Sequence, residues 1–213
     1  MAAVARVATE DRGTPNRELA QLGEQIFDDP GLSEPPGLAC ASCHDPARGF
    51  ADPRGGAVSA GAPPGAVGFR NAPSLAYAMF TPPFSAAGPV GGLNRDGRAA
   101  TFVDQAVRPL LNPAEMANPD AATLMNKVAA APYAEDFRRI FGADVFSDPE
   151  RAFGHLREAL SAYEQTDEFR RFDSKYDFVQ RGEAQFTPQE AQGFALFNDP
   201  EKGNCAACHP AGG

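Results

Sequence analysis

The sequence predicts a mainly α-helical protein with long loops rich in glycine and proline, and three observations support this fold class. Apolar residues recur at helical spacing behind capped helix starts. One segment occurs twice, once near each end of the chain, and no stretch alternates between apolar and polar residues as a strand does. With 213 residues, 43% of them hydrophobic, the chain can form one large domain or two small ones.

N-cap residues indicate where three of the expected helices begin. Three sites pair an N-cap residue with proline at the first helical position: Asn118-Pro119, Asp148-Pro149 and Thr187-Pro188. The third continues to Glu190 as Thr-Pro-Gln-Glu, which is a capping box. The apolar residues behind the second site fall on one helical face: Phe153, Leu156, Leu160 and Tyr163.

Two further helices and a long loop complete the expected pattern. One helix begins at Thr101 and is expected to end at Pro109, and a short one over Tyr133–Phe141 is expected to stop at Gly142. Residues 45–97 hold 10 of the 21 Gly and 8 of the 20 Pro, which argues against long helices or strands there. We expect this loop to wrap the edge of a bound group.

The repeated segment precedes two identical motifs. Gly23-Glu-Gln-Ile-Phe-Asp-Asp-Pro30 resembles Gly193-Phe-Ala-Leu-Phe-Asn-Asp-Pro200, and a Cys-x-x-Cys-His unit follows each copy. These units contain all four Cys and two of the three His of the chain: Cys40-Ala-Ser-Cys43-His44 and Cys205-Ala-Ala-Cys208-His209. Two copies of one helix–loop–motif unit are the simplest explanation.

A Cys-x-x-Cys-His unit is typical of covalent heme c attachment. The two thiols add to the two vinyl groups of the macrocycle, and the next residue, here His44 or His209, binds iron from the proximal face. The sequence therefore predicts two covalently bound heme c groups. Zinc binding and thioredoxin-like redox chemistry are weaker alternatives, because zinc ligands pair at closer spacing and a dithiol motif expects a βαβ context.

Composition excludes other classes of function. The net charge is −9 and no cluster of Lys and Arg suggests a nucleic-acid surface. No stretch approaches the ~20 apolar residues of a membrane span. Residues 1–22 contain no apolar signal-peptide core, so we expect a periplasmic protein whose signal peptide is absent from this chain.

Four motifs between the heme units occur in order: Asn71-Ala-Pro-Ser-Leu75, Arg95-Asp-Gly-Arg-Ala-Ala-Thr101, Gln105-Ala-x-x-Pro109 and Asn112-Pro-Ala-Glu-Met116. This set resembles the bacterial diheme cytochrome c peroxidase family, which includes the MauG-like methylamine-utilisation enzymes, over about residues 17 to 213. The resemblance implies two cytochrome c-like domains. We expect the first, peroxidatic domain over 17–165 and an incomplete electron-transfer domain over 166–213, truncated at its heme motif.

The resemblance also implies roles for single residues. Glu115 matches the distal-pocket glutamate, which would act as acid and base on peroxide, and Gln105 matches its nearby glutamine. Met116 is expected in the pocket wall and Arg98 in contact with the heme. Asn71 matches an asparagine that helps to hold a calcium ion. Without the resemblance, Glu115 and Gln105 would be taken as ordinary polar residues at helix ends.

Three departures from the family pattern matter. Arg95 stands where these peroxidases usually have a tryptophan between the hemes, and the chain has no Trp. Pro63 stands where many have a resting-state distal histidine, and no His lies between 45 and 154, so we expect the first heme to be open to peroxide. The chain ends four residues after His209, and we favour a fragment over an exposed second heme.

The expected function is reduction of hydrogen peroxide to water with electrons from a small donor protein, a cytochrome c or a cupredoxin. Oxidation of a protein substrate through a high-valent heme, as in MauG-like enzymes, is one alternative. A diheme electron carrier without catalysis is another, and it would need both irons to be six-coordinate. A homodimer is a further option.

Overall fold

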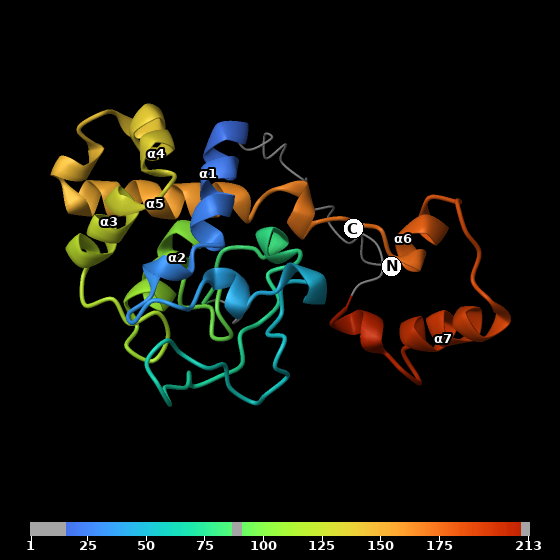
Figure 1. Ribbon diagram of the computed structural model, residues 1–213. Coiled ribbons are helices and arrows are strands. Elements are labelled where there is room, and N and C mark those ends of the chain that lie inside the picture. The colour runs from blue at the N-terminus through green and yellow to red at the C-terminus, as the bar shows by residue number, and fades with distance from the viewer. Residues whose placement is uncertain (1–15, 87–90, 210–213) are drawn as a thin grey trace. The chain divides into compact units, whose positions relative to one another are not determined.

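The computed structural model describes residues 16–86 and 91–209 (Figure 1). These residues form helices, short 3₁₀ turns and loops, with isolated β-bridges but no strand, so the mainly α fold class is confirmed. The chain divides into two compact units, one over Thr14–Arg170 and one that includes Arg171–Gly213. None of the helices in the described ranges is long and apolar enough to cross a membrane.

The described residues of the first unit form five α-helices: α1 (Arg17–Phe27), α2 (Phe102–Leu111), α3 (Ala121–Ala130), α4 (Ala134–Phe141) and α5 (Pro149–Tyr163). Its 3₁₀ turns are η1 (Pro30–Leu32), η2 (Cys40–Ser42), η3 (Pro46–Arg48), η4 (Ala78–Phe80), η5 (Val145–Ser147) and η6 (Asp167–Phe169). Residues 45–86 and 91–97 contain only two of these turns, η3 and η4, as the glycine and proline content predicts.

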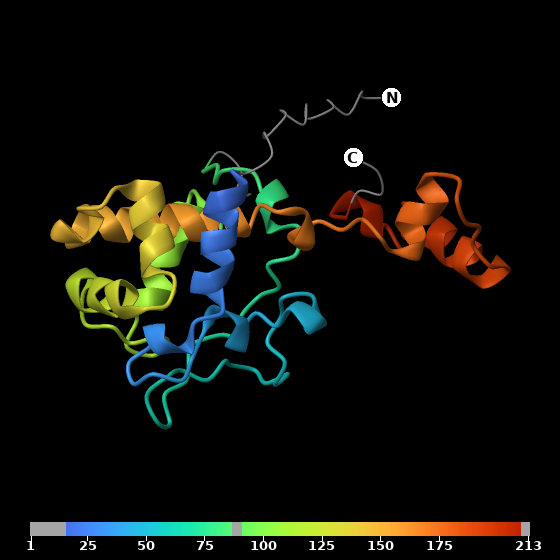
Figure 2. The ribbon, with the colours of Figure 1, turned by 45° about the horizontal axis from the view of Figure 1, so that its top comes forward.

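Helix α5 is the centre of the first unit, and α1 crosses it (Figures 1 and 2). The crossing is close because Gly23 of α1 has no side chain: a Cβ there would lie 2.0 Å from the carbonyl oxygen of Ala159 on α5. Phe27, at the end of α1, packs edge-on against Tyr163 with ring centroids 5.3 Å apart. Phe169 stacks on Phe50 at 3.9 Å and closes this aromatic core.

The second unit contains α6 (Lys175–Gln180), α7 (Pro188–Asn198) and the 3₁₀ turn η7 (Cys205–Ala207). Tyr176, Phe186 and Phe194 form a small aromatic cluster, with centroid separations of 5.6–6.4 Å. Helix α7 buries none of its residues.

Several of the predicted helix boundaries are confirmed. Asp148 caps α5 by accepting a hydrogen bond from Arg151 N, and Thr187 caps α7 in the predicted capping box. Helix α4 ends at Gly142, whose φ of 108° lies in the region that favours glycine. The apolar face predicted for α5 is buried.

The predicted helix start at Asn118-Pro119 is wrong. Helix α3 begins two residues later, where Asp120 caps it by accepting from Thr123 N. Asn118 is only 1% exposed, and its Nδ2 donates to the carbonyl oxygens of Leu32 and Leu110. Because this amide joins two distant segments, it is not free to cap a helix.

The predicted end of a helix at Pro109 is also wrong. Thr101 caps α2 as expected, but the helix passes through Pro109 to Leu111. A proline removes one backbone donor near the end of a helix and does not forbid the turn that follows. Asn112 N donates to Arg108 O beyond it, and Leu110 is 1% exposed in the core, so burial offsets the lost hydrogen bond.

The repeated segment folds the same way in both copies. Helices α1 and α7 end within the shared pattern, and each is followed by a 3₁₀ turn at the first cysteine. His44 N donates to Cys40 O at 2.9 Å, and His209 N donates to Cys205 O at 2.8 Å. The predicted helix–loop–motif unit is therefore present twice.

Candidate active site

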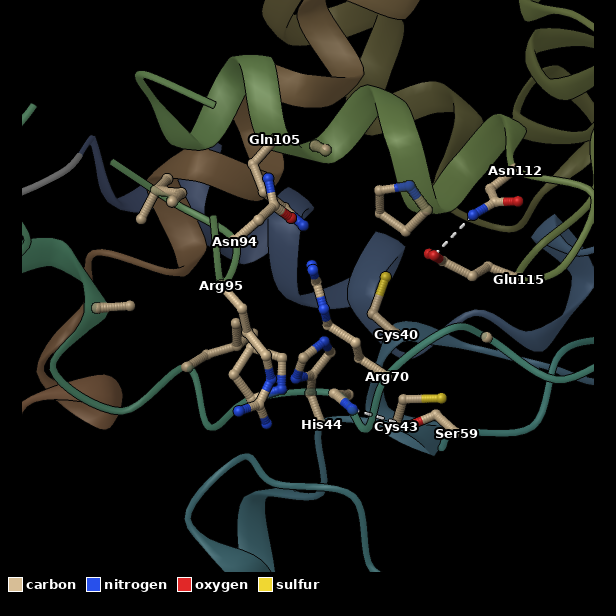
Figure 3. Close-up of a pocket in the computed structure, with 18 of the residues that line it drawn as sticks. Cys40, Cys43, His44, Ser59, Arg70, Asn94, Arg95, Gln105, Asn112 and Glu115 are labelled. Carbon is tan, nitrogen blue, oxygen red and sulfur yellow. Dashed lines mark hydrogen bonds between the residues drawn. The ribbon is translucent and has the colours of Figure 1, made fainter. Parts of the chain in front are cut away.

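The first unit encloses a cavity of about 670 Å³ (Figure 3). Cofactor and small-molecule sites typically measure about 300–1,000 Å³. The walls come from η2, from loops that contain residues 68–75 and 92–98, and from helices α2 and α5. Apolar side chains form much of the lining: Phe27, Leu38, Leu75, Leu93, Phe102, Leu110, Met116 and Leu160.

Turn η2 brings both thiols of the first heme motif to this cavity. Cys40 and Cys43 line it, and both are free cysteines. Burial raises the pKa of the Cys40 thiol to about 12, and the carboxylate of Glu164 adds to the shift. Burial also raises the pKa of Cys43, although Arg54, whose Nη2 lies 3.1 Å from the Cys43 Sγ, opposes it. Both groups are therefore S–H at neutral pH, as addition across two vinyl double bonds requires.

His44 uses one ring nitrogen for the backbone. Its Nδ1 lies 3.1 Å from the carbonyl oxygen of Phe50, so Nδ1 carries the proton and donates it. Burial lowers the pKa of His44, which keeps the ring neutral at pH 7. Nε2 then keeps its lone pair. A histidine held through Nδ1 by a carbonyl is the usual arrangement of a metal ligand, so His44 fits the role of heme iron ligand.

Glu115 reaches the cavity from the turn that follows α2 (Figure 3). Burial raises the pKa of its carboxyl, while a hydrogen bond from Asn112 and the charge of Arg98 oppose the shift. Asn112 Nδ2 donates to Glu115 Oε1 at 2.8 Å, and Asn112 Oδ1 accepts from Ala114 N at 3.0 Å. The same side chain thus shapes the turn and holds the carboxyl.

Neighbouring segments hold this turn on two more sides. Glu115 O accepts from Ala62 N at 2.8 Å, and Met116 O accepts from Glu34 N at 2.7 Å. A Cβ on Gly61 would lie 2.3 Å from the carbonyl oxygen of Ala114, so the loop can approach only as glycine. The backbone that carries Glu115 is therefore fixed by contacts remote in sequence.

The other residues named for the first heme also line the cavity. Gln105 reaches it from α2 (Figure 3), Met116 is 4% exposed in its wall, and Arg98 pairs with Asp96. Asn71 lines it too, and its Nδ2 donates to Gly56 O at 2.9 Å. Among the described residues, no group of three or more His, Cys, Asp and Glu side chains could hold a metal ion.

Several cavity residues were missed by the sequence reasoning. Arg70, Asn94 and Glu164 line the cavity, and burial raises the pKa of Glu164 to about 8. Asn112 stood inside a recognised motif without a role. Nothing in the local pattern singles out Arg70, Asn94 or Glu164, because a loop arginine, a turn asparagine and a carboxylate after a helix are all ordinary. His155, the third histidine, stacks on Phe141 with ring centroids 4.3 Å apart and does not line the cavity.

The second heme motif has a different setting. Cys205, Cys208 and His209 are exposed in the second unit. The position of a Cβ on Gly193 of α7 has no atom within 4 Å, whereas the matching Gly23 of α1 is tightly packed. In the described part of the chain, the repeat thus supplies the second copy with its attachment residues but not with a packed helix partner.

Comparison with known proteins places these observations in one family. A family model described as di-haem cytochrome c peroxidase matches residues 17–185. The methylamine utilization protein MauG of Paracoccus denitrificans is 48% identical over 199 residues, which are 90% of this chain and 51% of that protein. The cytochrome c551 peroxidase of Pseudomonas aeruginosa is 30% identical over 203 residues, covering 94% of this chain and 53% of that protein.

A solved structure agrees with these relatives. The diheme peroxidase BthA from Burkholderia thailandensis superposes with a TM-score of 0.85 and 46% identity, covering 92% of this chain and 49% of that one. The chain spans about half the length of the curated relatives it matches. The resemblance predicted from the four internal motifs is confirmed, and this chain belongs to the di-haem cytochrome c peroxidase family.

Proposed function

We propose that this chain carries the peroxide-reacting site of a diheme c-type peroxidase, which reduces hydrogen peroxide to water with electrons from a small redox protein. One observation carries the proposal: the Glu115 carboxyl and the neutral His44 ring line the same cavity as two free thiols. His44 is the only histidine among the residues lining this cavity, so no second imidazole there competes for the distal position.

The cavity fits heme c in volume and in chemistry. Cys40 and Cys43 would form the two thioethers, and His44 Nε2 would bind the iron. The bound heme would supply the iron that reacts with peroxide and the path for electrons. The apolar lining suits the hydrophobic faces of the ring, and the buried Met116 forms part of that lining.

Glu115 is the proposed acid and base. Reduction of one H₂O₂ consumes two electrons and two protons and releases two waters. Glu115 would accept a proton from one peroxide oxygen and return it to the other as the O–O bond breaks, a role that contributes roughly 10²–10⁴-fold. Burial favours the protonated form, while Asn112 keeps the ionised form accessible. Gln105 would orient peroxide without titrating.

We infer that Cys205, Cys208 and His209 bind a second heme c that receives electrons from a cytochrome c or a cupredoxin. The repeat and the diheme family support this inference. Covalent heme attachment also supports a periplasmic location. Calcium binding at Asn71 stays a prediction, for which Asn71 Oδ1 would be the available ligand atom, and so does a homodimer.

Oxidation of a protein substrate is a second candidate function. It is favoured by the higher identity to a MauG protein, 48%, than to the cytochrome c551 peroxidase of Pseudomonas aeruginosa, 30%. A reaction with peroxide is common to both candidates. They differ in what supplies the electrons, which is a soluble donor in one and a protein side chain in the other.

The test uses the full chain with heme attached. We expect the Soret band to respond rapidly to H₂O₂ in stopped-flow mixing, and steady turnover with reduced cytochrome c or cupredoxin to distinguish the peroxidase from the protein oxidant. Glu115→Gln should lower the peroxide rate roughly 10²–10⁴-fold while the heme content stays unchanged. Glu150→Gln, on the exposed first turn of α5, is the matched control and should behave as wild type. Full activity in Glu115→Gln would remove the assignment, and a Soret band insensitive to peroxide would favour an electron carrier.

A further inference from the structure

Four further polar side chains line the cavity. They are Arg70, Asn94, Arg95 and Arg98, which we call the arginine rim. Three of them lie in a tight turn closed by reciprocal hydrogen bonds between Leu93 and Ala99. In Figure 3, Asn94 and Arg95 reach the cavity from one side, and Cys40 and Cys43 reach it from the other.

The arginine rim has an excess of positive charge. Two of its three guanidinium groups share one carboxylate, Asp96, which bonds to Arg98 Nη1 at 2.5 Å and to Arg70 Nη1 at 3.4 Å. Arg95 instead donates through Nη2 to the carbonyl oxygen of Asn71 at 3.3 Å. Each guanidinium offers five N–H donors, so most donors of the rim have no acceptor among these contacts. With Asp96 as the carboxylate to which it bonds, the rim keeps a net positive charge.

Asn94 gives an independent sign of a missing acceptor. Its Nδ2 is buried and has no hydrogen-bond partner among the described residues. Asn94 has a φ of 64°, a left-handed conformation that turns the side chain toward the cavity, as Figure 3 shows. Buried donors are almost always satisfied in native proteins, by protein groups, by ordered water or by a bound group, so this donor is available to an acceptor in the cavity.

Heme c itself carries groups that could accept these hydrogen bonds. The macrocycle has its two vinyl groups at one edge and its two propionate carboxylates at the opposite edge. Cys40 and Cys43 would form thioether bonds with the vinyl groups. We propose that the part of the arginine rim in the Leu93–Ala99 turn binds those two propionates, with Arg95 supplying charge and Asn94 Nδ2 donating to a carboxylate oxygen. This inference rests on the proposed heme at Cys40 and Cys43.

Arg95 distinguishes this propionate site from that of the related peroxidases. The family resemblance leads us to expect a tryptophan at position 95, and a cation takes its place. A guanidinium beside a propionate offsets the negative charge at the ring edge, which disfavours the ferric state relative to the ferrous state. Arg95 therefore raises the one-electron reduction potential of the first heme and positions its propionates.

The test compares Arg95→Gln with the unsubstituted protein in the full chain that carries Cys205→Ala and Cys208→Ala, so that only the first heme is observed. We expect the midpoint potential to fall by an amount equal to about a tenfold change in the reduction equilibrium, about 59 mV for one electron. The propionate bending bands in the resonance Raman spectrum should shift as well. Arg95→Lys should restore most of the potential but not the bands, because an ammonium cannot reproduce the planar fork of donors.

Arg108→Gln is the matched control, since Arg108 is exposed on α2 and does not line the cavity. It removes the same charge and should leave potential and bands unchanged. A normally loaded Arg95→Gln protein with unchanged potential and unchanged propionate bands overturns the inference. Failure of the proposed function is distinguishable, because it appears as absence of covalent heme at the first motif or as full peroxide activity in Glu115→Gln.

Discussion

Substituting alanine for glycine at the two matching positions of the repeat should have opposite effects on stability. Gly23 lies where α1 crosses α5, and a Cβ there would be 2.0 Å from Ala159 O, 2.7 Å from Ala159 C and 2.8 Å from Tyr163 Cβ. Two of these atoms are backbone atoms of a central helix, so no side-chain rotation relieves the clash. Gly193, in the second copy, has no atom within 4 Å of its Cβ position.

The magnitude follows from the two environments. Overpacking of a core costs about 1–3 kcal/mol, and the backbone clash at Gly23 puts Gly23→Ala at the upper end. For a chain of this length, ~3 kcal/mol lowers the Tm by roughly 6–12 °C. Gly193→Ala meets open space and improves helix propensity, which should stabilise the second unit by up to ~1 kcal/mol.

Thermal and urea unfolding of the heme-loaded full chain, followed by far-UV circular dichroism, measures both effects. Each variant serves as the control for the other, because the same substitution is made at equivalent positions. An unchanged unfolding transition in Gly23→Ala, or an equal loss of stability in Gly193→Ala, would refute the reasoning from the helix crossing.

Two further predictions concern charged groups. Asn112→Leu removes the hydrogen bond that lowers the pKa of Glu115, so the acid limb of the pH profile for the peroxide reaction should move to higher pH, and an unmoved limb would contradict the role of Asn112. Burial of Asp52 would raise its pKa, but hydrogen bonds from Arg54 and Ser59 outweigh burial and lower it to about 2. This contribution to stability is present above the unfolded pKa near 4 and is lost as pH falls toward 2, so acid titration of the unfolding free energy should be shallower in Asp52→Asn than in wild type.

The local elements of this fold follow from short stretches of sequence. The caps at Asp148 and Thr187 were predictable because an N-cap bonds to backbone two or three residues away. The turns at the two heme motifs repeat for the same reason. The helix start at Asn118 was mispredicted because its buried side-chain amide bonds to Leu32, which is distant in the sequence. The helix end at Pro109 was mispredicted because the side chain of Leu110, one residue later, is buried in the core.

The residues of the site also fall into those that a local motif identifies and those that tertiary contacts bring together. Cys40, Cys43 and His44 are adjacent in the chain, so this motif and its second copy are recognisable without any structure. Glu115 and Gln105 were found only through a family resemblance. Their placement on one cavity with His44 comes from tertiary contacts.

Which polar residues face that cavity depends on contacts between segments distant in the sequence. In the sequence, Asn94 is an ordinary residue of a turn. Only the folded structure shows that its Nδ2 is buried without a hydrogen-bond partner. Asn112 and Gly61 act through contacts that fix the turn carrying Glu115. Covalent attachment needs neighbours along the chain, so sequence determines it. A pocket forms only where residues distant in the sequence come together, and here the packing of α1, α2 and α5 with the loops between them brings them together.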